Sequence, residues 1–231
     1  MTADTGHHDA EDDMTTTGAT TSATTGMTTE QTATAERLMA PARQFVDKVR
    51  ALFAEGFEES VLWGRIGEEL RTLLTAPELR AHTGTWPDTK VGDGPPSNLL
   101  FYEDPDYGFV MNALVKSPGS VTFVHDHGPS WTLYGVLAGG EHIERYTRID
   151  DNPVDTGPAE LKHVDAFDVS PGFVDVVPPW QIHQEMNGAD RTIGFIVRSQ
   201  RSGTFPQYRY NMESGEIMKS GGPTQIPFAL S

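Results

Sequence analysis

Residues 124–131 read VHDHGPSW and place two histidines, His125 and His127, one residue apart. In an extended chain, residues i and i+2 point to the same face, so both imidazoles would point toward one place. A shared metal ion is one explanation, and a pair of ordinary surface histidines is the other. The remainder of the sequence has to decide between them.

The histidine pair belongs to the first of two regularly spaced blocks. That block begins at Gly119, reaches His125 after five intervening residues, and ends at Gly139. The second block supplies a third histidine. This block begins at Gly172, and five residues separate that glycine from Pro178, Pro179 and Trp180. Two residues then separate Trp180 from His183, and three separate His183 from Asn187. Three histidines in two such blocks favour the metal.

The two blocks resemble the paired motifs of the cupin superfamily, a small double-stranded β-helix barrel. The usual first motif is Gly, five residues, H-x-H, three or four residues, Glu, six residues, Gly. The usual second motif is Gly, five residues, P-x-G, two residues, His, three residues, Asn. Two departures occur, since Thr132 replaces the Glu and Trp180 replaces the second Gly. The resemblance implies a mainly β cupin barrel whose metal ligands are His125, His127 and His183.

The absence of the motif Glu points to one group within the cupins. Among cupins, three histidines without it are typical of thiol dioxygenases, the cysteine dioxygenase family. Residues 101–148, FYEDPDYGFVMNALVKSPGSVTFVHDHGPSWTLYGVLAGGEHIERYTR, resemble the bacterial members that act on cysteine or 3-mercaptopropionate. The resemblance covers about residues 97–200. It implies Fe(II), dioxygen and a small anionic thiol that is oxidised to a sulfinate.

The donor set agrees with this chemistry without naming the metal. Imidazole nitrogen suits several transition metals, so Mn, Ni, Cu and Zn remain open beside Fe(II). Three protein ligands leave coordination positions free, as a catalytic site requires. Because all three are neutral, the charge of a divalent ion favours an anionic donor such as a thiolate, whose pKa the ion lowers. Zinc with a bound water would make an equally sound hydrolytic site.

A third departure, this one from the pattern of the thiol dioxygenases, concerns the strand after the third histidine. Thiol dioxygenases usually carry a Ser-x-His-x-Tyr relay there, but residues 188–200 read GADRTIGFIVRSQ. Gly194, Ile196 and Arg198 occupy the three relay positions and share the strand face that should look into the barrel. A buried Arg requires an anionic partner, and its planar fork suits a carboxylate. We therefore predict that Arg198 anchors a substrate carboxylate, the alternatives being solvent exposure or pairing with Glu141 or Glu144.

Other side chains near the motifs are candidates for the pocket. Tyr134, our second catalytic candidate, and Trp131 follow the histidine pair and are expected as pocket walls or core aromatics. Trp180 is placed to cap the pocket mouth. Asn112 lies near the position where cysteine-specific enzymes have a carboxylate-binding Arg, so free cysteine is not clearly favoured. No cysteine is present, so the Cys–Tyr crosslink of some cysteine dioxygenases cannot form.

Composition excludes several classes of partner. Lys and Arg number 17 against 33 Asp and Glu, a formal net charge of −16. This charge argues against binding nucleic acid or an anionic membrane. With no cysteine, disulfides and thiolate ligands are excluded. The sequence shows no secretory signal and no apolar run of 18 residues, so we expect a soluble, cytoplasmic protein.

Local composition and apolar patterning divide the chain into four parts. Residues 1–34 are rich in Thr, Ala, Gly and Ser and are expected to be a disordered leader. Residues 35–83 have apolar residues at helical spacing, with Val61, Leu62 and Ile66 on one side of the second helix, and should pack on the barrel. Residues 84–210, with short apolar runs between Gly, Pro and Asp clusters, are predicted to form the cupin domain. Residues 211–231 are expected as a C-terminal tail, and its last part, GGPTQIPFALS, is expected to be irregular and able to lie against the barrel.

Two other functions remain compatible with the motifs. The first is another three-histidine cupin enzyme, namely a carbon–carbon-cleaving dioxygenase, a lyase or an isomerase, which the missing relay favours. The second is a non-catalytic cupin that binds a small ligand. In each case the partner is a small molecule. Cupins often form homodimers, but the sequence identifies no interface.

Overall fold

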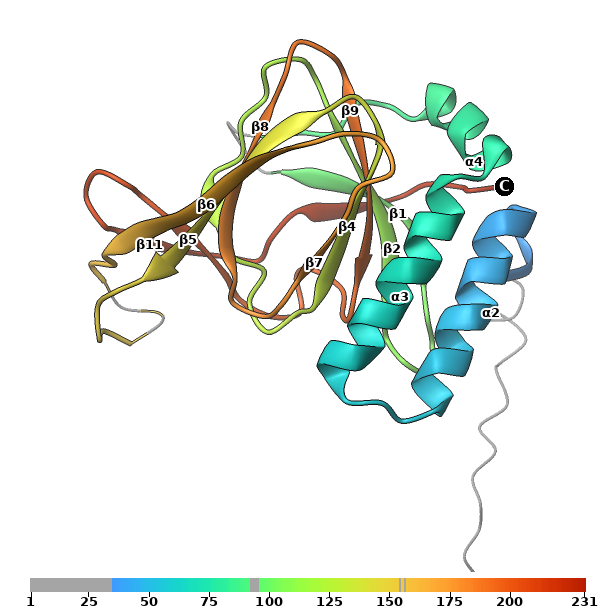
Figure 1. Ribbon diagram of the computed structural model, residues 1–231, viewed down its shortest axis with the longest axis horizontal. Coiled ribbons are helices and arrows are strands. Elements are labelled where there is room, and N and C mark those ends of the chain that lie inside the picture. Colours follow the sequence, from blue (N-terminus) through green and yellow to red (C-terminus); the bar gives the residue numbers. More distant parts are fainter. Residues whose placement is uncertain (1–34, 92–95, 154, 156) are drawn as a thin grey trace, which may run out of the picture.

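The computed structural model describes residues 35–91, 96–153, 155 and 157–231. The leader predicted for residues 1–34 lies outside the described residues. The helices come first along the chain and the strands follow (Figure 1). The helices are α2 (Ala40–Ala54), α3 (Glu59–Leu74) and α4 (Pro77–His82), followed by the 3₁₀ turn η1 (Thr83–Thr85).

The helices α2 and α3 pack through their apolar stripes. Gly56, with a φ of 71°, lies in the short connection that reverses the chain between them. The stripe of α3 is broadly as predicted, and its buried residues are Leu62, Trp63, Ile66, Gly67, Leu70, Leu73 and Leu74. Val61 does not belong to it and is 47% exposed. One residue corresponds to about 100° around a helix, which turns Val61 away from the face of Leu62.

In the described part of the chain, twelve strands form two six-stranded sheets. The first sheet has the order β12-β1-β2-β9-β4-β7, and its strands are β1 (Ser97–Glu103), β2 (Val110–Lys116), β4 (Thr132–Ala138), β7 (Val174–Val177), β9 (Thr192–Arg198) and β12 (Thr224–Pro227). The second sheet has the order β11-β10-β3-β8-β5-β6, and its strands are β3 (Val124–His125), β5 (Glu141–Arg148), β6 (Leu161–Val169), β8 (Ile182–Asn187), β10 (Gln207–Tyr210) and β11 (Ile217–Ser220).

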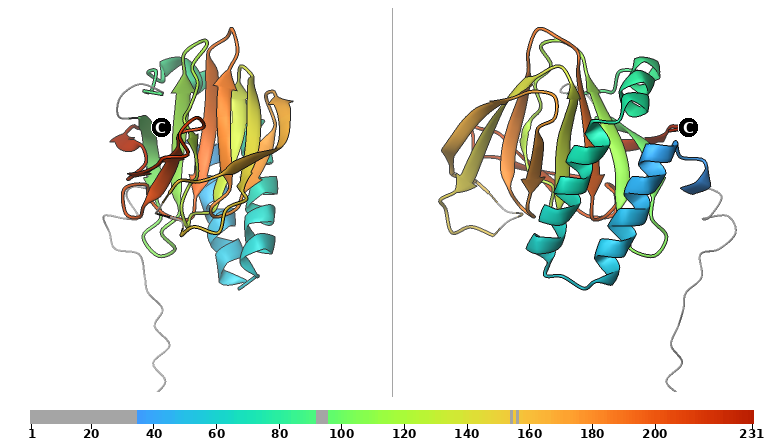
Figure 2. Two further views of the ribbon diagram at one scale, coloured as in Figure 1. Left: turned by 90° about the vertical axis from the view of Figure 1, so that its left-hand side faces the viewer. Right: turned by 45° about the vertical axis from the view of Figure 1, so that its right-hand side comes forward.

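The chain passes back and forth between the two sheets, which enclose a common interior (Figure 2). Among the strands that the structure describes, every pair is antiparallel except β1 with β12. The predicted architecture, a mainly β barrel of two sheets with an N-terminal helical pair, is confirmed. One motif glycine has a clear structural reason: Gly139 has a φ of 75°, and a Cβ there would lie 2.6 Å from the carbonyl oxygen of Arg191.

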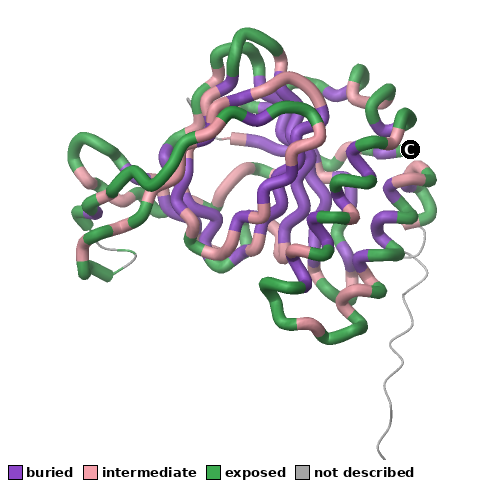
Figure 3. The backbone as a smooth tube through the Cα atoms, in the orientation of Figure 1, coloured by how far each residue is buried: buried purple, intermediate pink, exposed green. Residues whose placement is uncertain are grey.

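The helical pair covers the outer face of the first sheet, so that sheet is buried on both sides (Figure 3). Alternate residues of strand β9 lie in two different hydrophobic clusters. Ile193, Phe195 and Val197 belong to the large cluster beneath the helices, whereas Ile196 belongs to a smaller cluster inside the barrel. Alternate side chains of a strand point to opposite faces. The interior of the barrel therefore receives Gly194, Ile196 and Arg198.

The C-terminal segment lies against the barrel, as the prediction allowed, but it is paired into the sheets and is not irregular. Strand β11 pairs with β10, and β12 pairs in parallel with β1. Leu230 is buried, and its carbonyl accepts a hydrogen bond from the N–H of Met39 at the start of α2. The prediction was wrong because four-residue strands between Gly and Pro carry no alternating apolar pattern. Their order comes from backbone pairing with strands formed earlier in the chain.

Among the described residues, no helix is long and apolar enough to cross a membrane.

Candidate metal centre

The structure brings His125, His127 and His183 together on the second sheet. His125 is the last residue of β3 and lies directly opposite His183 of β8 in the antiparallel register. His127 follows two residues later. The ligand atoms that the three imidazoles offer all lie within 4.8 Å of one another. The ring of His183 lies 4.7 Å, centroid to centroid, from each of the other two rings.

The free ring nitrogens suit a metal ion. The Nδ1 of His125 lies 2.8 Å from the carbonyl oxygen of Phe123, and donation to that carbonyl leaves Nε2 unprotonated. The Nε2 of His183 and the Nδ1 of His127 are buried and have no hydrogen-bond partner among the described residues. Unpaired buried polar atoms are costly. A cation that accepts these lone pairs removes the cost, so the three residues fit a metal of the kind that imidazole binds.

Burial also sets the protonation state of two of the ligands. It lowers the pKa of His127 well below its ordinary value, with the charge of Arg198 acting in the same direction. Burial likewise lowers the pKa of His183 to about 3. Both rings are therefore neutral at pH 7, which is the form that coordinates metals.

Asp126, between the two histidines of the pair, points to the opposite side and holds the turn. Its carboxylate accepts hydrogen bonds from the N–H groups of Gly128 (2.8 Å) and Tyr208 (3.1 Å) and from the hydroxyl of Tyr210 (2.7 Å). The segment with both histidines is thereby tied to β10. Asp126 positions the ligands and does not itself face them, as strand parity requires.

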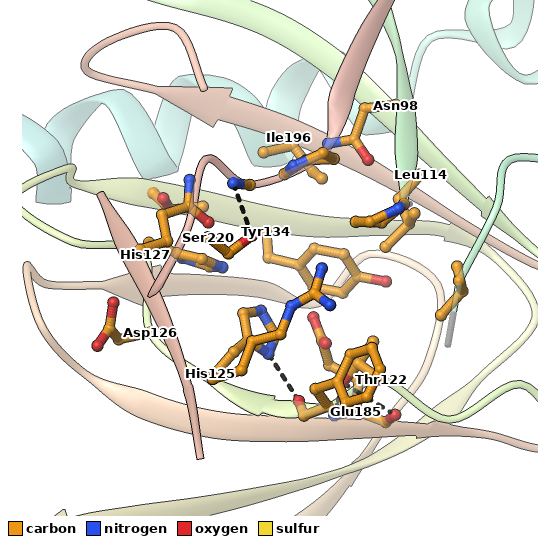
Figure 4. A pocket seen from close by; sticks show the side chains of 18 of the residues that line it. Asn98, Leu114, Thr122, His125, Asp126, His127, Tyr134, Glu185, Ile196 and Ser220 are labelled. Atoms are coloured by element: carbon orange, nitrogen blue, oxygen red, sulfur yellow. Dashed lines mark hydrogen bonds between the residues drawn. The ribbon is translucent and has the colours of Figure 1, made fainter. Parts of the chain in front are cut away.

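A cavity of about 90 Å³ adjoins the histidines (Figure 4). Its size suits a small molecule. Although the chain is acidic overall, three cationic side chains contribute to its wall, and they are Lys90, Arg198 and Arg209. His125, His127, Tyr134 and Glu185 are among the other side chains that line it (Figure 4).

Arg198 faces this cavity and is 4% exposed. Among the described residues, its guanidinium donates one hydrogen bond, from Nη1 to the hydroxyl of Ser202 at 3.2 Å, and its Nε has no partner. Burial lowers the pKa of Arg198 to about 10, while the charge of Glu185 opposes that shift. The alternative of pairing with Glu141 or Glu144 is wrong. Neither carboxylate forms an ion pair with the guanidinium. Glu141 instead forms a salt bridge with Lys116, and Glu144 accepts a hydrogen bond from the hydroxyl of Tyr146.

Tyr134 contributes its ring to the cavity wall, but its hydroxyl is already engaged. It donates to Glu141, whose carboxylate also pairs with the fully buried Lys116. Burial, reinforced by the charge of Glu141, raises the pKa of Tyr134. The ring packs directly over Gly194, where a Cβ would lie 2.6 Å from the ring carbon Cζ. The glycine at the first relay position thus makes room for this tyrosine.

The remaining predicted pocket residues, Trp131, Trp180 and Asn112, are not among the residues that line the cavity. Trp131 packs against the cluster beneath the helices, and its Nε1 donates to Glu59 of α3 at 3.1 Å. Trp180 stacks on the cavity-lining Tyr208, with centroids 6.3 Å apart, and is 43% exposed. Its φ of 65° lies in the left-handed region, which explains why this motif position usually holds Gly. Asn112 is buried and donates to the carbonyl of Leu99 at 3.2 Å.

The motif search missed Glu185. It is 6% exposed, lines the cavity, and places Oε1 3.9 Å from Nε2 of His183. Burial alone raises the pKa of a carboxyl group, but the positive charge of Lys116 brings that of Glu185 down to about 2. The signal was present in the sequence, since Glu185 follows His183 by two residues and a strand turns both to one face. Thr132, at the usual Glu position, also lines the cavity, and its buried Oγ1 lacks a partner among the described residues.

No family model matches the sequence, and no curated protein matches it. Solved structures do match. They include the cupin domain of Schizosaccharomyces pombe Cnp3, with 10% identity over 45% of this chain and 60% of that chain at a TM-score of 0.35. An oxalate oxidase in complex with the substrate analogue glycolate has 18% identity over 55% of this chain and 54% of that chain at a TM-score of 0.36. CapF has 20% identity over 52% of this chain and 33% of that chain at a TM-score of 0.37.

These likenesses are distant. The chain covers 51%, 60% and 42% of the first three matching structures, so it spans about half their length. At such identities and TM-scores, neither a family nor an activity is transferred to this chain. The functional argument therefore rests on the site itself.

Proposed function

We propose that this protein is a mononuclear metal-dependent dioxygenase that acts on a small thiol bearing a carboxylate and converts the thiol to a sulfinate. Fe(II) is the metal we propose. One observation supports the proposal above the others. Three histidines converge beside a cavity that also holds a buried guanidinium with no ion-paired carboxylate among the described residues.

The reaction balances without a further reductant. A thiol, RSH, and one dioxygen give RSO₂H, because both oxygen atoms are added to sulfur and the thiol supplies the electrons. A bound redox-active metal would supply the dioxygen chemistry and favour the thiolate form of the substrate. This stoichiometry requires no nicotinamide or flavin.

The side chains of this chain have separate tasks in the proposal. His125, His127 and His183 hold the metal through neutral nitrogens. Arg198 binds the substrate carboxylate with its fork and so fixes the sulfur relative to the metal. The ring of Tyr134 and the side chain of Ile196 wall the cavity from the opposite sheet. Because the hydroxyl of Tyr134 donates to Glu141, we assign Tyr134 a positioning task and no proton transfer.

Oxygen uptake by the full chain, loaded with Fe(II) under anaerobic conditions, tests the proposal. The thiols are cysteine, 3-mercaptopropionate, cysteamine and mercaptosuccinate. We expect uptake with a carboxylate-bearing thiol, a sulfinate product, little uptake with cysteamine, and loss of uptake in His183→Ala. Absence of uptake with every thiol, at one bound iron per chain, would reject the thiol dioxygenase.

A second candidate is a three-histidine cupin enzyme with another reaction: a carbon–carbon-cleaving dioxygenase, a lyase or an isomerase. Two observations favour it. The relay positions hold Gly194, Ile196 and Arg198, and Glu185 adds a negative charge beside the histidines. That charge weakens the argument that the metal needs an anionic sulfur ligand. Turnover of a small carboxylate substrate without dioxygen would identify the lyase or isomerase, whereas uptake of dioxygen with a diketone or a catechol would identify the cleaving dioxygenase.

A further inference from the structure

Arg209 is a second guanidinium at the cavity, and the proposed function gives it no task. It lies on β10 directly opposite His125 of β3, and His125 in turn lies opposite His183 of β8. Residues directly opposite one another on paired strands share a face of the sheet. The side chain of Arg209 therefore continues the row of the two histidines, and it lines the cavity beside His125.

The charge of Arg209 has no anionic partner in the described part of the chain. Its guanidinium carbon lies 4.4 Å from the centroid of the Phe123 ring, a contact that orients the group without neutralising it. Burial lowers the pKa of Arg209, but a guanidinium stays protonated at neutral pH. Arg145, which lies opposite His183 at the other end of the row, is paired with Asp175 at 2.6 Å. Of these two cations, Arg209 is the one left for a ligand.

The two cavity arginines approach from different sheets. Arg198 ends β9 in the first sheet, whereas Arg209 lies on β10 in the second. Ile196 shares the inward face of Arg198, and His125 shares that of Arg209. Ile196 and His125 lie on either side of the cavity (Figure 4). A ligand between the sheets can therefore meet one guanidinium on each wall.

The other charged groups of the wall do not neutralise the two arginines. Asp126 is engaged in the three hydrogen bonds that hold the turn, and Glu185 forms no ion pair with either guanidinium among the described residues. The third cation, Lys90, is exposed, so water can solvate its ammonium. Two like charges that face one cavity repel each other, and a carboxylate on each would remove that repulsion. A monocarboxylate leaves one guanidinium unpaired, so the charges fit a ligand with two anionic groups.

We propose that Arg209 is a second anion anchor, and that the substrate is a small dicarboxylate whose two carboxylates bind Arg198 and Arg209. The inference rests on the proposed function and deepens it, because it restricts the thiol to one with two carboxylates. Of the four thiols in the oxygen-uptake experiment, mercaptosuccinate alone has this arrangement. Arg198 orients the carboxylate that all carboxylate-bearing thiols share, and Arg209 selects the dicarboxylate among them.

Binding of succinate and butyrate to the metal-free full chain, measured by isothermal titration calorimetry, tests the inference without thiol, metal or dioxygen. The two ligands have the same four-carbon chain and differ by one carboxylate. The variants are Arg209→Met, which keeps an apolar stem over Phe123, and Arg209→Lys, which keeps the charge. Arg201→Met is the matched control, because it also removes one cation, which is paired with Glu103 at 2.9 Å and does not line the cavity.

We expect the wild type to bind succinate about 10-fold more tightly than butyrate, although the formal net charge of −16 disfavours a dianion. Arg209→Met should lower the affinity for succinate about 10-fold and leave that for butyrate unchanged, with Arg209→Lys between it and the wild type. Arg201→Met should match the wild type. Equal affinity for the two ligands in the wild type, or equal losses for both in Arg209→Met, would overturn the second anchor.

The outcomes separate this inference from the proposed function. A succinate preference that depends on Arg209, together with no oxygen uptake from any thiol, would reject the dioxygenase and leave the dicarboxylate site standing. Oxygen uptake with 3-mercaptopropionate, in a protein that binds succinate no better than butyrate, would keep the dioxygenase and overturn the dicarboxylate substrate. Unfolding in urea shows whether each variant is folded, and the comparison of the two ligands in the wild type needs no variant.

Discussion

Arg198 is a buried guanidinium that forms no ion pair with a carboxylate of the described residues. We predict that Arg198→Met raises the KM for a carboxylate-bearing substrate about 10- to 100-fold, because a hydrogen bond to a charged group contributes about 1.5–3 kcal/mol. Arg198→Lys should restore part of the loss, since it keeps the charge without the fork. Steady-state kinetics checks this. Arg191→Met, which removes a surface cation paired with Asp88, is the control. An unchanged KM in Arg198→Met would reject the anchor.

Single residues also show what sequence reasoning can reach. The three histidines were predictable because turns and strand ends fix their spacing, and Arg198 because strand parity fixes its face. Glu185 was missed because the search followed the usual motif position, which holds Thr132, and did not apply the same parity to the residues around His183. The partner of Glu141 was unpredictable from sequence, since Lys116 lies on another strand and meets it only across the barrel interior.

Strand β9 shows how one element places several groups, and Gly194 is its critical residue. A Cβ at this position would collide with the ring of Tyr134. We predict that Gly194→Ala lowers the free energy of unfolding by about 1–3 kcal/mol, as overpacking does, and displaces the ring from the cavity wall. Gly64→Ala in α3, where a Cβ meets nothing within 4 Å, should instead stabilise the protein by about 0.5–1 kcal/mol. Urea denaturation measures both, and effects of the same sign would contradict this packing.

The elements were predictable to different degrees. Periodic apolar residues predict the helical pair and the main strands, because each of these elements buries one face or both. Strands β11 and β12 show no such pattern, since each is four residues long and half-exposed. They form by adding backbone hydrogen bonds to the edges of β10 and β1, a long-range pairing that local pattern does not encode.

At the scale of the whole molecule, the buried neutral histidines make folding depend on pH. Burial lowers the pKa of His183 from 6.5 to about 3. Below pH 6.5 the unfolded chain binds a proton at this site that the folded chain does not, so stability falls as pH falls, until about pH 3. The slope is about 1.4 kcal/mol per pH unit for each such histidine.

We therefore predict that the metal-free protein loses stability between pH 6.5 and pH 4 more steeply than its His183→Gln variant does. The free energy of unfolding in urea, measured at several pH values for both proteins, gives the difference in slope. Carboxylates contribute equally to both curves and cancel in the comparison. Parallel curves would show that His183 is not held neutral by burial.

The most direct test of the central claim is the stoichiometry of metal binding. Equilibrium dialysis of the metal-free full chain against Fe(II), without dioxygen, followed by metal analysis, counts the ions per chain. The account predicts one ion per chain and none in a His127→Ala/His183→Ala variant that keeps the wild-type circular dichroism spectrum. No bound ion in the wild type, or one ion that persists in this variant, would contradict it.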